Sequence, residues 1–446
     1  MTINRDLYLN QLIAAKRDGF IKIITGIRRC GKSYLLFKLF KQHLLAAGVS
    51  PEHIIEVDLE KKSSQNLRAP DPLLAHIQKR LVHDGKTNYV LIDEIQYCKR
   101  TLNADIDLSR IHPDDLDECY TTFYDVLNEL RTTPCVDCYV TGSNSKMLSS
   151  DVATTFRGRG EEIRVFPLSM AEFLPLREPI TDLKSVLREY LMYGGLPDCV
   201  LKTDERAKRD YLDNLCKTIY LRDVGERNKI RNEPLLNALF DIVMSNVGCL
   251  TNPTKLANAV TTVAKLPANA VTVSKYLDYL RDAFLIGRAA RYDVKGKHYL
   301  DYPVKYYAED PGLRNVQMNF RQYEPTHLME NVIYNELIRR GYSVDVGVVE
   351  TRAINKDGVR EQRQHEIDFV VNRDSERIYI QSAWEIPDEA KREQELFSLT
   401  HVHDAFRKIV VTGDPYEKPW MSKEGVTFIG IVPFLVNQKS IETLDR

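Results

Sequence analysis

Apolar and polar positions recur along the chain with different periods, and the changes of period mark its elements. The run FIKIIT is apolar and rich in β-branched residues, which predicts a short buried strand over residues 21–24. After a stretch with two glycines, LLFKLF repeats apolar residues at three- and four-residue spacing, which predicts a helix. The apolar runs in YVLIDEIQY and CYVTGSNS predict further strands that end in polar side chains. The first third of the chain therefore predicts a parallel α/β sheet.

The patterns change twice further along the chain. Residues 169–228 contain LKSVLREYLMYGG and RAKRDYLDNLCKTIYLRDV, whose apolar spacing predicts a helical lid. Residues 229–312 then predict three short helices and two strands around a turn at 294–297, which is the order of elements in a winged helix-turn-helix. In the last third, HLMENVIYNELIRRGYSVDVGVV predicts a helix and a strand, and HEIDFVVN and RIYIQSAWEI predict two more strands.

Composition limits what these elements can form. A chain of 446 residues is long enough for two to four domains, and its 43% hydrophobic residues allow each to bury a core. Lys and Arg total 62 against 63 Asp and Glu, so the net charge of -1 excludes a uniformly basic coat. Eight Cys are too few for a disulfide scaffold, and the pair Cys135 and Cys138 has no second motif to complete a zinc site. With no long apolar stretch and a charged start, we expect a cytoplasmic protein without membrane contact.

The glycine-containing stretch after the first strand matches a phosphate-binding loop. Its sequence GIRRCGKS fits G-x-x-x-x-G-K-[ST]. The predicted ATP-binding residues are Gly26, Ile27, Arg28, Arg29, Cys30, Gly31, Lys32, Ser33 and Tyr34. Glycines let backbone N–H groups close around phosphate oxygens, and the next helix offers its positive N-terminal end. We expect Lys32 to reach the β- and γ-phosphates of ATP and the Ser33 hydroxyl to ligate Mg²⁺.

The two carboxylates that end the strand YVLID form a Walker B pattern. Asp93 is expected to hold Mg²⁺ through water, and Glu94 to orient and deprotonate the attacking water. The alternative is a strand end with solvated acids. Asn144, after the neighbouring strand, is the candidate that senses the water or the γ-phosphate, although an ordinary turn has the same composition.

Two arginines follow in the glycine-flanked loop TFRGRG. Arg157 or Arg159, with Arg159 preferred, is placed to reach phosphate in this subunit or a neighbouring one. Solvated loop arginines are an equal alternative.

Taken in order, GIRRCGKS, LIDEIQY, TGSNS, the RGR loop, FPLSMAEF and YGGLP resemble the prokaryotic AAA+-type ATPases. This family is related to the STAND and archaeal ATPases and usually carries a C-terminal domain of unknown function. The resemblance covers essentially the whole chain, and it implies that Pro197 packs against the adenine ring and that subunits form a ring or hexamer. Residues 99–120 depart from the family pattern, because this segment is longer and more acidic, and we interpret it as an added loop.

The predicted winged helix has features of a DNA-binding surface. Its candidate DNA-binding residues are Ser274, Lys275, Arg291, Lys295 and Lys297. Between residues 288 and 305 five basic residues, the last of them Lys305, outnumber two acids, and three tyrosines lie among them. Basic groups can neutralise phosphates and tyrosines can stack on bases or pack on sugars. The alternative is a winged helix that makes protein contacts.

The last third resembles a PD-(D/E)xK nuclease core. Glu330 lies on the predicted helix, and Asp368 and Gln381 lie on two predicted strands, with Glu366 as a further acid. Such a core needs a lysine to position the water, but the motif position after Gln381-Ser382 holds Ala383. We therefore predict a domain that no longer cleaves and instead holds DNA or assembles subunits.

These patterns together predict a P-loop ATPase core over residues 1–168, a helical lid over 169–228, a winged helix over 229–312 and a degenerate restriction-endonuclease-like α/β domain over 313–446. The predicted function is ATP hydrolysis coupled to DNA remodelling or translocation by an oligomer. The alternatives are a STAND-like nucleotide-dependent switch that acts through protein contacts, and an ATP-regulated nuclease.

Overall fold

The protein forms two compact units, Met1–Val165 and Phe166–Arg446, in a computed structural model. The structure describes residues 3–103, 106, 112, 116, 119–142, 160–321, 323–354 and 360–442. The boundary between the units falls close to the predicted end of the ATPase core. The second unit contains all the regions predicted as lid, winged helix and nuclease-like domain.

The first unit is built around a five-stranded parallel sheet with the strand order β2-β3-β6-β1-β7. Its strands are β1 (Ile21–Thr25), β2 (Ile54–Asp58), β3 (Asn88–Asp93), β6 (Val136–Thr141) and β7 (Gly160–Arg164). Its helices are α1 (Asp6–Ala14), α2 (Lys32–Tyr34), the π-helical η1 (Leu35–Phe40), α3 (Lys41–Ala46), α4 (Pro70–Gln78) and α5 (Phe123–Thr132). The predicted parallel sheet is confirmed, and β1, β3 and β6 are the three strands that the apolar runs predict.

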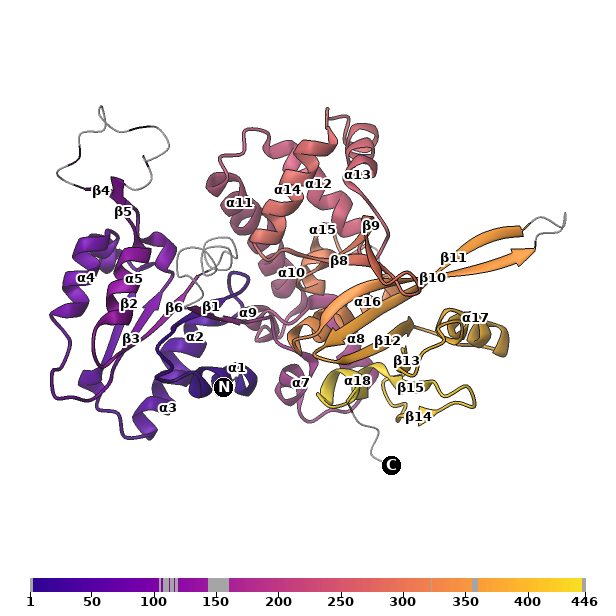
Figure 1. The fold of residues 1–446 in the computed structure, drawn as a ribbon, viewed down its shortest axis with the longest axis horizontal. Coiled ribbons are helices and arrows are strands. Elements are labelled where there is room, and N and C mark those ends of the chain that lie inside the picture. The colour runs from indigo at the N-terminus through magenta and orange to yellow at the C-terminus, as the bar shows by residue number, and fades with distance from the viewer. Residues whose placement is uncertain are drawn as a thin grey trace. The chain divides into compact units, whose positions relative to one another are not determined.

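Helices cover both faces of this sheet. Figure 1 shows α4 and α5 on one face and α1, α2 and α3 on the other. Ile21 and Ile23 of β1 pack in the core that also contains Leu73 of α4 and Leu127 of α5. Because both faces are covered, every residue of β1 and β3 is buried, as the continuous apolar runs predict.

The segment expected to be an added loop begins and ends in a small sheet of its own. The strands β4 (Thr101–Leu102) and β5 (Tyr120–Thr121) pair antiparallel at its base. Most residues between these strands lie outside the described part of the chain.

The second unit begins with a helical part. Its helices are α7 (Met170–Phe173), α8 (Leu183–Tyr193), α9 (Pro197–Val200), α10 (Glu205–Asn214), η9 (Leu215–Tyr220), α11 (Leu221–Arg227), α12 (Glu233–Ser245), α13 (Pro253–Ala259), η10 (Val260–Ala264), α14 (Ala270–Asp282) and α15 (Pro311–Gln317). Asparagine side chains begin three of them, because Asn232, Asn252 and Asn269 each accept a hydrogen bond from the backbone N–H three residues later. The predicted helices of the middle region are therefore present.

A mixed eight-stranded sheet forms the rest of the second unit, with the order β14-β15-β13-β12-β11-β10-β8-β9. Its strands are β8 (Ile286–Asp293), β9 (His298–Ala308), β10 (Ser343–Ile354), β11 (Arg360–Arg373), β12 (Glu376–Ala383), β13 (Arg407–Thr412), β14 (Trp420–Met421) and β15 (Thr427–Gly430). The hairpin β8–β9 joins this sheet because β8 pairs parallel with β10. The two strands predicted for a winged helix are thus continuous with the strands predicted for the nuclease-like region.

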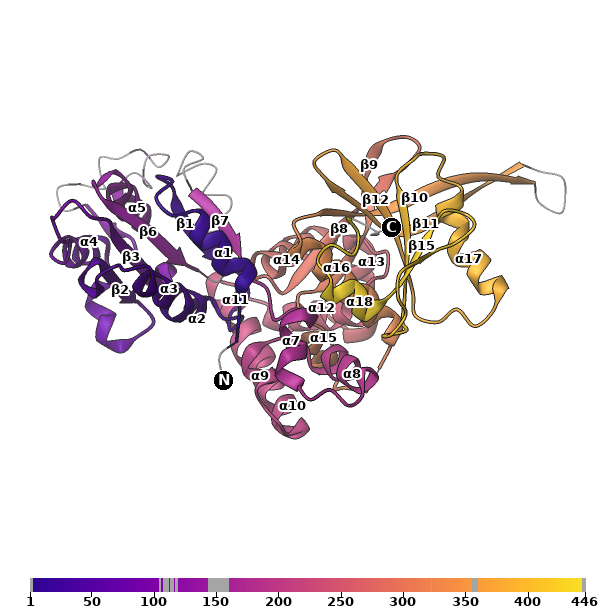
Figure 2. The ribbon, with the colours of Figure 1, turned by 90° about the horizontal axis from the view of Figure 1, so that it is seen from below.

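Three helices pack on this sheet, namely α16 (Pro325–Arg339), α17 (Glu389–Thr400) and α18 (Ile431–Val436). Figure 2 shows α17 on one side of the sheet and α16 with α18 on the other. Leu396 and Leu399 of α17 join a core with Val410 of β13 and Phe428 of β15. Among the helices that the structure describes, none is both long and apolar enough to cross a membrane.

Candidate functional site

The loop between β1 and α2 has the backbone conformation of a tight phosphate-binding loop. Gly26, Arg29 and Gly31 have positive φ angles of 136°, 70° and 104°. A Cβ atom at Gly26 would lie 2.1 Å from the carbonyl oxygen of Val165, so only glycine fits at this position. The helix that follows begins at Lys32 and continues without a break through η1 and α3 to Ala46. Its N-terminal end therefore faces the loop.

The buried Lys32 side chain lies inside this loop. Its Nζ donates hydrogen bonds to the carbonyl oxygens of Gly26 at 3.0 Å and Ile27 at 3.1 Å. These carbonyl partners carry no full charge, so the ammonium retains its charge for an anion.

The other predicted ATP-binding residues fix the loop from outside. Arg28 pairs with Glu60 at 2.8 Å, and the carbonyl oxygen of Cys30 accepts a hydrogen bond from Arg5 at 3.1 Å. The Tyr34 hydroxyl accepts a hydrogen bond from the backbone N–H of Ile3 at 3.1 Å.

Asp93 lies at the end of β3, beside two hydroxyl groups. Its Oδ1 accepts a hydrogen bond from the Thr141 hydroxyl at 2.5 Å, and the Ser33 hydroxyl is a second hydrogen-bond partner. Burial raises the pKa of Asp93 to about 6, although both hydroxyls oppose this shift. The structure therefore brings together the two predicted metal ligands, Ser33 and Asp93.

Glu94 follows in an uncommon backbone conformation. Its φ angle is 53°, in the left-handed region, and only 7% of the residue is exposed. Its backbone N–H donates to the Thr141 hydroxyl at 2.9 Å, and its carboxylate accepts a hydrogen bond from Gln96. A non-glycine residue with such a φ angle is uncommon, and its backbone is held in this conformation by the surrounding structure.

Thr141 is a site residue that the sequence reasoning missed. It is the last residue of β6, and its hydroxyl bonds both Asp93 and the backbone of Glu94. The available signal was a hydroxyl residue at the end of the strand that precedes Gly142. Asn144, Arg157 and Arg159 lie outside the described residues, so their predicted roles stay predictions.

The segment around Pro197 has a structural explanation within the second unit. The backbone N–H of Gly195 donates to Asp310 Oδ2 at 2.7 Å. A Cβ atom at Gly194, where φ is 74°, would lie 1.8 Å from Asp310 Oδ1. In the GGLP motif Gly194 therefore makes room for the buried Asp310 carboxylate and Gly195 donates a hydrogen bond to it, while Pro197 is the first residue of α9.

The phosphate-binding loop, Ser33 and Asp93 fit a nucleotide with Mg²⁺. A hydroxyl and a carboxylate, on Ser33 and Asp93, are oxygen ligands of the kind that Mg²⁺ takes. Ser33 lies in the first turn of the helix that carries Lys32, and Asp93, at the end of β3, is its hydrogen-bond partner. The loop glycine at position 26 has no side chain to obstruct phosphate.

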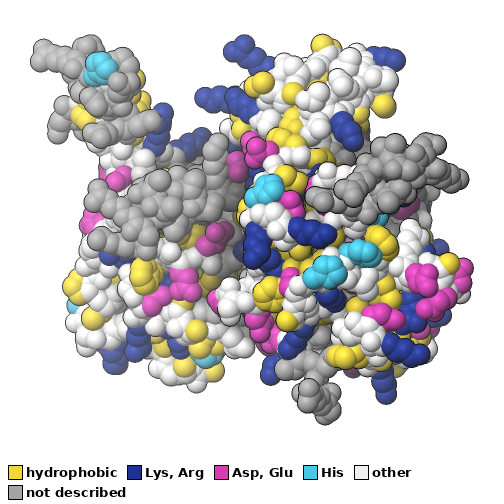
Figure 3. Space-filling view, turned by 45° about the vertical axis from the view of Figure 1, so that its right-hand side comes forward, with side chains coloured by type: hydrophobic (Ala, Val, Ile, Leu, Met, Phe, Trp, Pro, Cys, Tyr) yellow, Lys and Arg dark blue, Asp and Glu magenta, His cyan; other side chains and the backbone are white. Residues whose placement is uncertain are grey.

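The predicted DNA-binding residues separate into two groups. Ser274 and Lys275 line a hollow of about 620 Å³ at the N-terminal ends of α13 and α14. Tyr302 of β9 also lines it, with 45% of its surface exposed. Figure 3 shows Lys and Arg side chains along the outer edge of the helical part, over α11–α14. This hollow combines a basic group, a hydroxyl and an aromatic ring.

The second group lies on the β8–β9 hairpin. Arg291 donates to Gln364 Oε1 at 3.1 Å, and Lys295 donates to the carbonyl oxygen of Glu350 at 2.6 Å. Both partners belong to the β10–β11 hairpin, so Arg291 and Lys295 are bonded within the sheet. Lys297 is exposed in the turn, with a φ angle of 54°.

Lys305 is not part of this basic surface, and its inclusion in the predicted basic cluster was wrong. Only 3% of the residue is exposed, because β9 carries it into the interior of the second unit. Its Nζ pairs with Glu330 at 2.9 Å, with Asp368 at 3.4 Å and with Glu366. The Tyr307 hydroxyl also donates to Glu330, at 2.7 Å.

The residues predicted for a degenerate nuclease site are therefore brought together, with a lysine among them. Gln381 accepts a weak hydrogen bond from the backbone N–H of Asp368 at 3.4 Å. Burial raises the pKa of Glu330 to about 7 against the opposing charge of Lys305. Burial lowers the pKa of Lys305, but the charges of the three carboxylates outweigh it and the net pKa is raised. Within the described ranges, no group of acidic, His or Cys side chains has the arrangement to hold a metal ion.

Comparisons with known proteins identify an AAA domain in the first part of the chain. A family model described as an AAA domain matches residues 18–174, and a model described as Domain of unknown function (DUF8612) matches residues 184–324. An uncharacterized protein of Haemophilus influenzae is 33% identical over 437 residues, which cover 97% of this chain and 98% of that protein. An uncharacterized protein of Methanocaldococcus jannaschii is 26% identical over 404 residues, covering 88% and 80%. Among solved structures, the Walker-type ATPase of Pyrococcus abyssi matches with a TM-score of 0.47 and 15% identity, covering 71% of this chain and 96% of that one.

Proposed function

The chain belongs to the same family as the uncharacterized Haemophilus influenzae relative and contains an AAA domain, and on this premise we propose that it hydrolyses ATP to remodel or translocate DNA bound by its second unit. One observation carries the ATPase half of this proposal. At the end of the parallel sheet, the Asp93 carboxylate is hydrogen-bonded to the hydroxyls of Ser33 and Thr141. The Thr141 hydroxyl in turn accepts a hydrogen bond from the backbone N–H of Glu94.

Each of these side chains has a task in hydrolysis under this proposal. Lys32 leaves its two carbonyl partners and binds the β- and γ-phosphates. Ser33 and Asp93 hold Mg²⁺, which when bound neutralises phosphate charge. Glu94 takes the proton of the attacking water, and the hydroxyl of Thr141 keeps the backbone of Glu94 in position.

Three further roles are proposed from the motifs. Asn144 orients the water or the γ-phosphate, and Arg159 stabilises the charge that develops during transfer, in this subunit or in a neighbour. Pro197 packs against the adenine ring. An arginine that acts on a neighbouring subunit requires an oligomer, which we propose to be a ring.

The DNA half rests on the hollow at α13 and α14. We propose that residues 229–312 act as a winged helix, in which Ser274 and Lys275 meet phosphate at the start of α14 and Tyr302 packs against sugar or base. Lys297 adds a phosphate contact from the exposed turn. Arg291 and Lys295 make weaker contributions, because they are already bonded to the β10–β11 hairpin.

The restriction-endonuclease-like domain, proposed for residues 313–446, does not cleave DNA under this proposal. The Lys305 ammonium lies among the three carboxylates and pairs with each of them. A nuclease assay with Mg²⁺ or Mn²⁺ should therefore show no nicking of plasmid DNA, whereas nicking that Asp368→Ala abolishes would establish a nuclease.

The deciding experiment measures ATP hydrolysis by the full chain with duplex, forked or no DNA at low salt. We expect DNA to stimulate hydrolysis and Lys275→Ala to weaken DNA binding. The variant should also lower the slope of log affinity against log salt concentration by about one, which corresponds to one lost phosphate contact. Arg206→Gln on the exposed face of α10, where the side chain is 90% exposed, is the matched control. The proposal would be contradicted if no DNA changed the rate of ATP hydrolysis and no DNA shifted on a gel at low salt.

A further inference from the structure

The second unit contains a pocket that none of the sequence motifs accounts for. Its volume is about 760 Å³, which is within the usual range for small-molecule sites. It lies at the carboxyl ends of β12 and β13, two neighbouring parallel strands. Ligands of open α/β sheets bind outside the carboxyl ends of such strands. All residues that line the pocket belong to the second unit, whereas the phosphate-binding loop belongs to the first.

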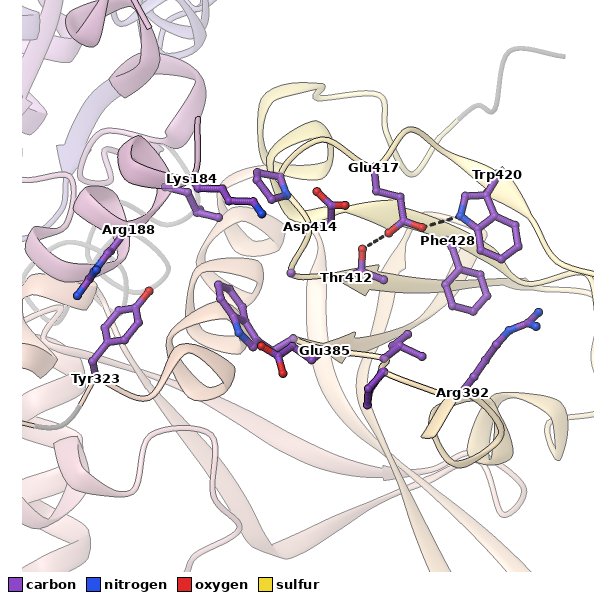
Figure 4. Close-up of a pocket in the computed structure, with 16 residues that line it drawn as sticks. Lys184, Arg188, Tyr323, Glu385, Arg392, Thr412, Asp414, Glu417, Trp420 and Phe428 are labelled. Atoms are coloured by element: carbon purple, nitrogen blue, oxygen red, sulfur yellow. Dashed lines mark hydrogen bonds between the residues drawn. The ribbon is translucent and has the colours of Figure 1, made fainter. Parts of the chain in front are cut away.

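Both tryptophans of the chain, Trp384 and Trp420, line this pocket, and Figure 4 labels Trp420. Trp384 directly follows β12 and is half-buried. A Cβ atom at Gly413 would lie 2.4 Å from the carbonyl oxygen of Trp384 and 2.8 Å from its ring, so glycine lets the indole lie against the end of β13. The backbone at Gly413 therefore holds the Trp384 indole in place.

The second tryptophan is also held in place. The Trp420 ring stacks on Phe428 with centroids 4.6 Å apart and an angle of 10°. Its Nε1 donates to Glu417 at 2.6 Å, and Glu417 also accepts a hydrogen bond from Thr412. With 42% of its surface exposed, Trp420 presents a rigid aromatic surface at low cost in conformational entropy.

Cationic groups stand beside the aromatic rings. Arg188 of α8 lies 5.5 Å from the centre of the Tyr323 ring, and Arg392 of α17 lies 5.8 Å from that of Trp420. The Arg392 guanidinium also pairs with Glu389 at 3.2 Å and with Glu424 at 3.5 Å, whereas its buried Nε has no hydrogen-bond partner among the described residues. Lys184 adds a third positive charge, and Figure 4 shows it on the same side of the pocket as Arg188.

Acidic groups limit the charge of a ligand. The lining also contains Glu385, Asp414 and Glu417, so three formal negative charges balance the three positive ones. A neutral pocket has little attraction for a triphosphate or for the backbone of a duplex. Its aromatic surfaces and separate guanidinium groups suit a planar heterocycle with a single phosphate.

We propose that this pocket binds one nucleotide, with its base stacked on an indole ring and its phosphate beside Arg188. The nucleotide is a free mononucleotide or an unpaired nucleotide of a single strand, since both present the same base and single phosphate. This site is separate from the ATP site of the proposed function and does not depend on it.

The two tryptophans allow a direct test, because no other residue of the chain is a tryptophan. The full chain carrying Lys32→Ala, which removes phosphate binding by the loop, is titrated with AMP and separately with a short oligodeoxyadenylate. We expect quenching of the tryptophan fluorescence that saturates. Quenching by AMP alone identifies a free nucleotide as the ligand, and quenching by the oligonucleotide alone identifies a strand. No saturable quenching by either probe overturns the proposal.

Substitutions then test whether the ligand binds in this pocket or on another surface. In calorimetric titrations of the probe that binds, Trp384→Leu should weaken affinity roughly fivefold or more, whereas Trp384→Phe, which retains an aromatic face, should weaken it less. Arg188→Gln changes an exposed side chain and should weaken affinity roughly threefold, even if the tryptophan variant does not fold. Arg206→Gln should leave affinity unchanged. Equal affinity in the Arg188 and Arg206 variants, with no loss from Trp384→Leu, would place the ligand elsewhere.

Discussion

Two regions of this protein contain both a buried lysine and buried carboxyl groups, and the lysine has different partners in each. In the first unit, Lys32 donates only to backbone carbonyl oxygens, and Asp93 is bonded to hydroxyls. In the second unit, Lys305 pairs directly with Glu330 and its neighbouring acids. In the first arrangement these hydrogen bonds join the lysine and the carboxyl group to neutral groups, as the proposed binding of a phosphate and a cation requires, whereas in the second the opposite charges form a buried ion pair. The same residue types therefore give a ligand site or a structural pair according to the partner of the lysine.

The largest expected effect comes from Lys32. Replacing it with alanine removes the charge that meets the phosphates, and we expect ATP hydrolysis to fall roughly a thousandfold, in the range seen when a charge is removed from phosphoryl transfer. Lys38→Ala, six residues further along the same continuous helix and exposed, is the control. Steady-state phosphate release measures both. Equal activity of the two variants would show that Lys32 has no specific role in ATP hydrolysis.

The second prediction concerns Lys305. Lys305→Met leaves three clustered carboxylates without their cation, and we expect the free energy of unfolding to fall by about 3 kcal/mol at pH 8 in urea titrations. Glu330 already has a pKa raised to about 7, and loss of the ammonium raises it further. A raised carboxyl pKa means that the folded variant binds protons more tightly than the unfolded chain, so its stability should recover as the pH falls from 8 to 6.

A double variant and a metal ion sharpen this prediction. Lys305→Met with Glu330→Gln removes one of the unpaired charges and should be more stable than the single variant. Mn²⁺ should raise the melting temperature of Lys305→Met but not that of the unchanged protein, because the lysine no longer competes with the metal. If Mn²⁺ stabilised both proteins equally, Lys305 would not occupy the position of a cation.

Thr141 provides a third, smaller effect. Thr141→Val removes the hydroxyl that bonds Asp93 and the backbone of Glu94, and we expect kcat to fall about tenfold, which corresponds to the loss of a charge-assisted hydrogen bond. Thr141→Ser retains the hydroxyl and should keep most of the activity. Similar losses in the two variants would point to packing of the methyl group instead.

The smallest expected effect is a pH dependence of Mg²⁺ binding. The pKa of Asp93 is raised to about 6, so the carboxylate is mostly ionised at pH 7 and mostly protonated at pH 5.5. Mg²⁺ requires the ionised form, and its apparent affinity should fall roughly fourfold between these values. Calorimetry with ADP present measures this change, and Asp93→Asn should bind weakly without such a dependence. No pH dependence would indicate that Asp93 is not the ligand.

Much of the first site could be predicted because each of its motifs lies within a few neighbouring residues of the chain. The phosphate loop lies within residues 26–33, and the apolar run of β3 places Asp93 at the end of a strand. Thr141 could not be assigned a role, because its contact with Asp93 depends on β6 lying next to β3. Strand order is a property of the whole sheet rather than of any local pattern.

The second unit shows the limit of local reasoning more clearly. The sequence suggests that Lys305 belongs to a basic hairpin with Lys297, yet β9 turns inward and carries it to Glu330 and Asp368. Trp384 and Trp420 show no motif in the sequence, and the ends of parallel strands bring them to one pocket.

The sequence by itself determined the elements, the phosphate loop and the strand-end acids, because hydrophobic period and glycine spacing act over a few residues. The tertiary structure decided which charges are free. Whether a lysine meets a backbone carbonyl, as Lys32 does, or a carboxylate, as Lys305 does, depends on strand neighbours and register over distances of up to 63 residues in the chain. These contacts form only when the complete sheets pack.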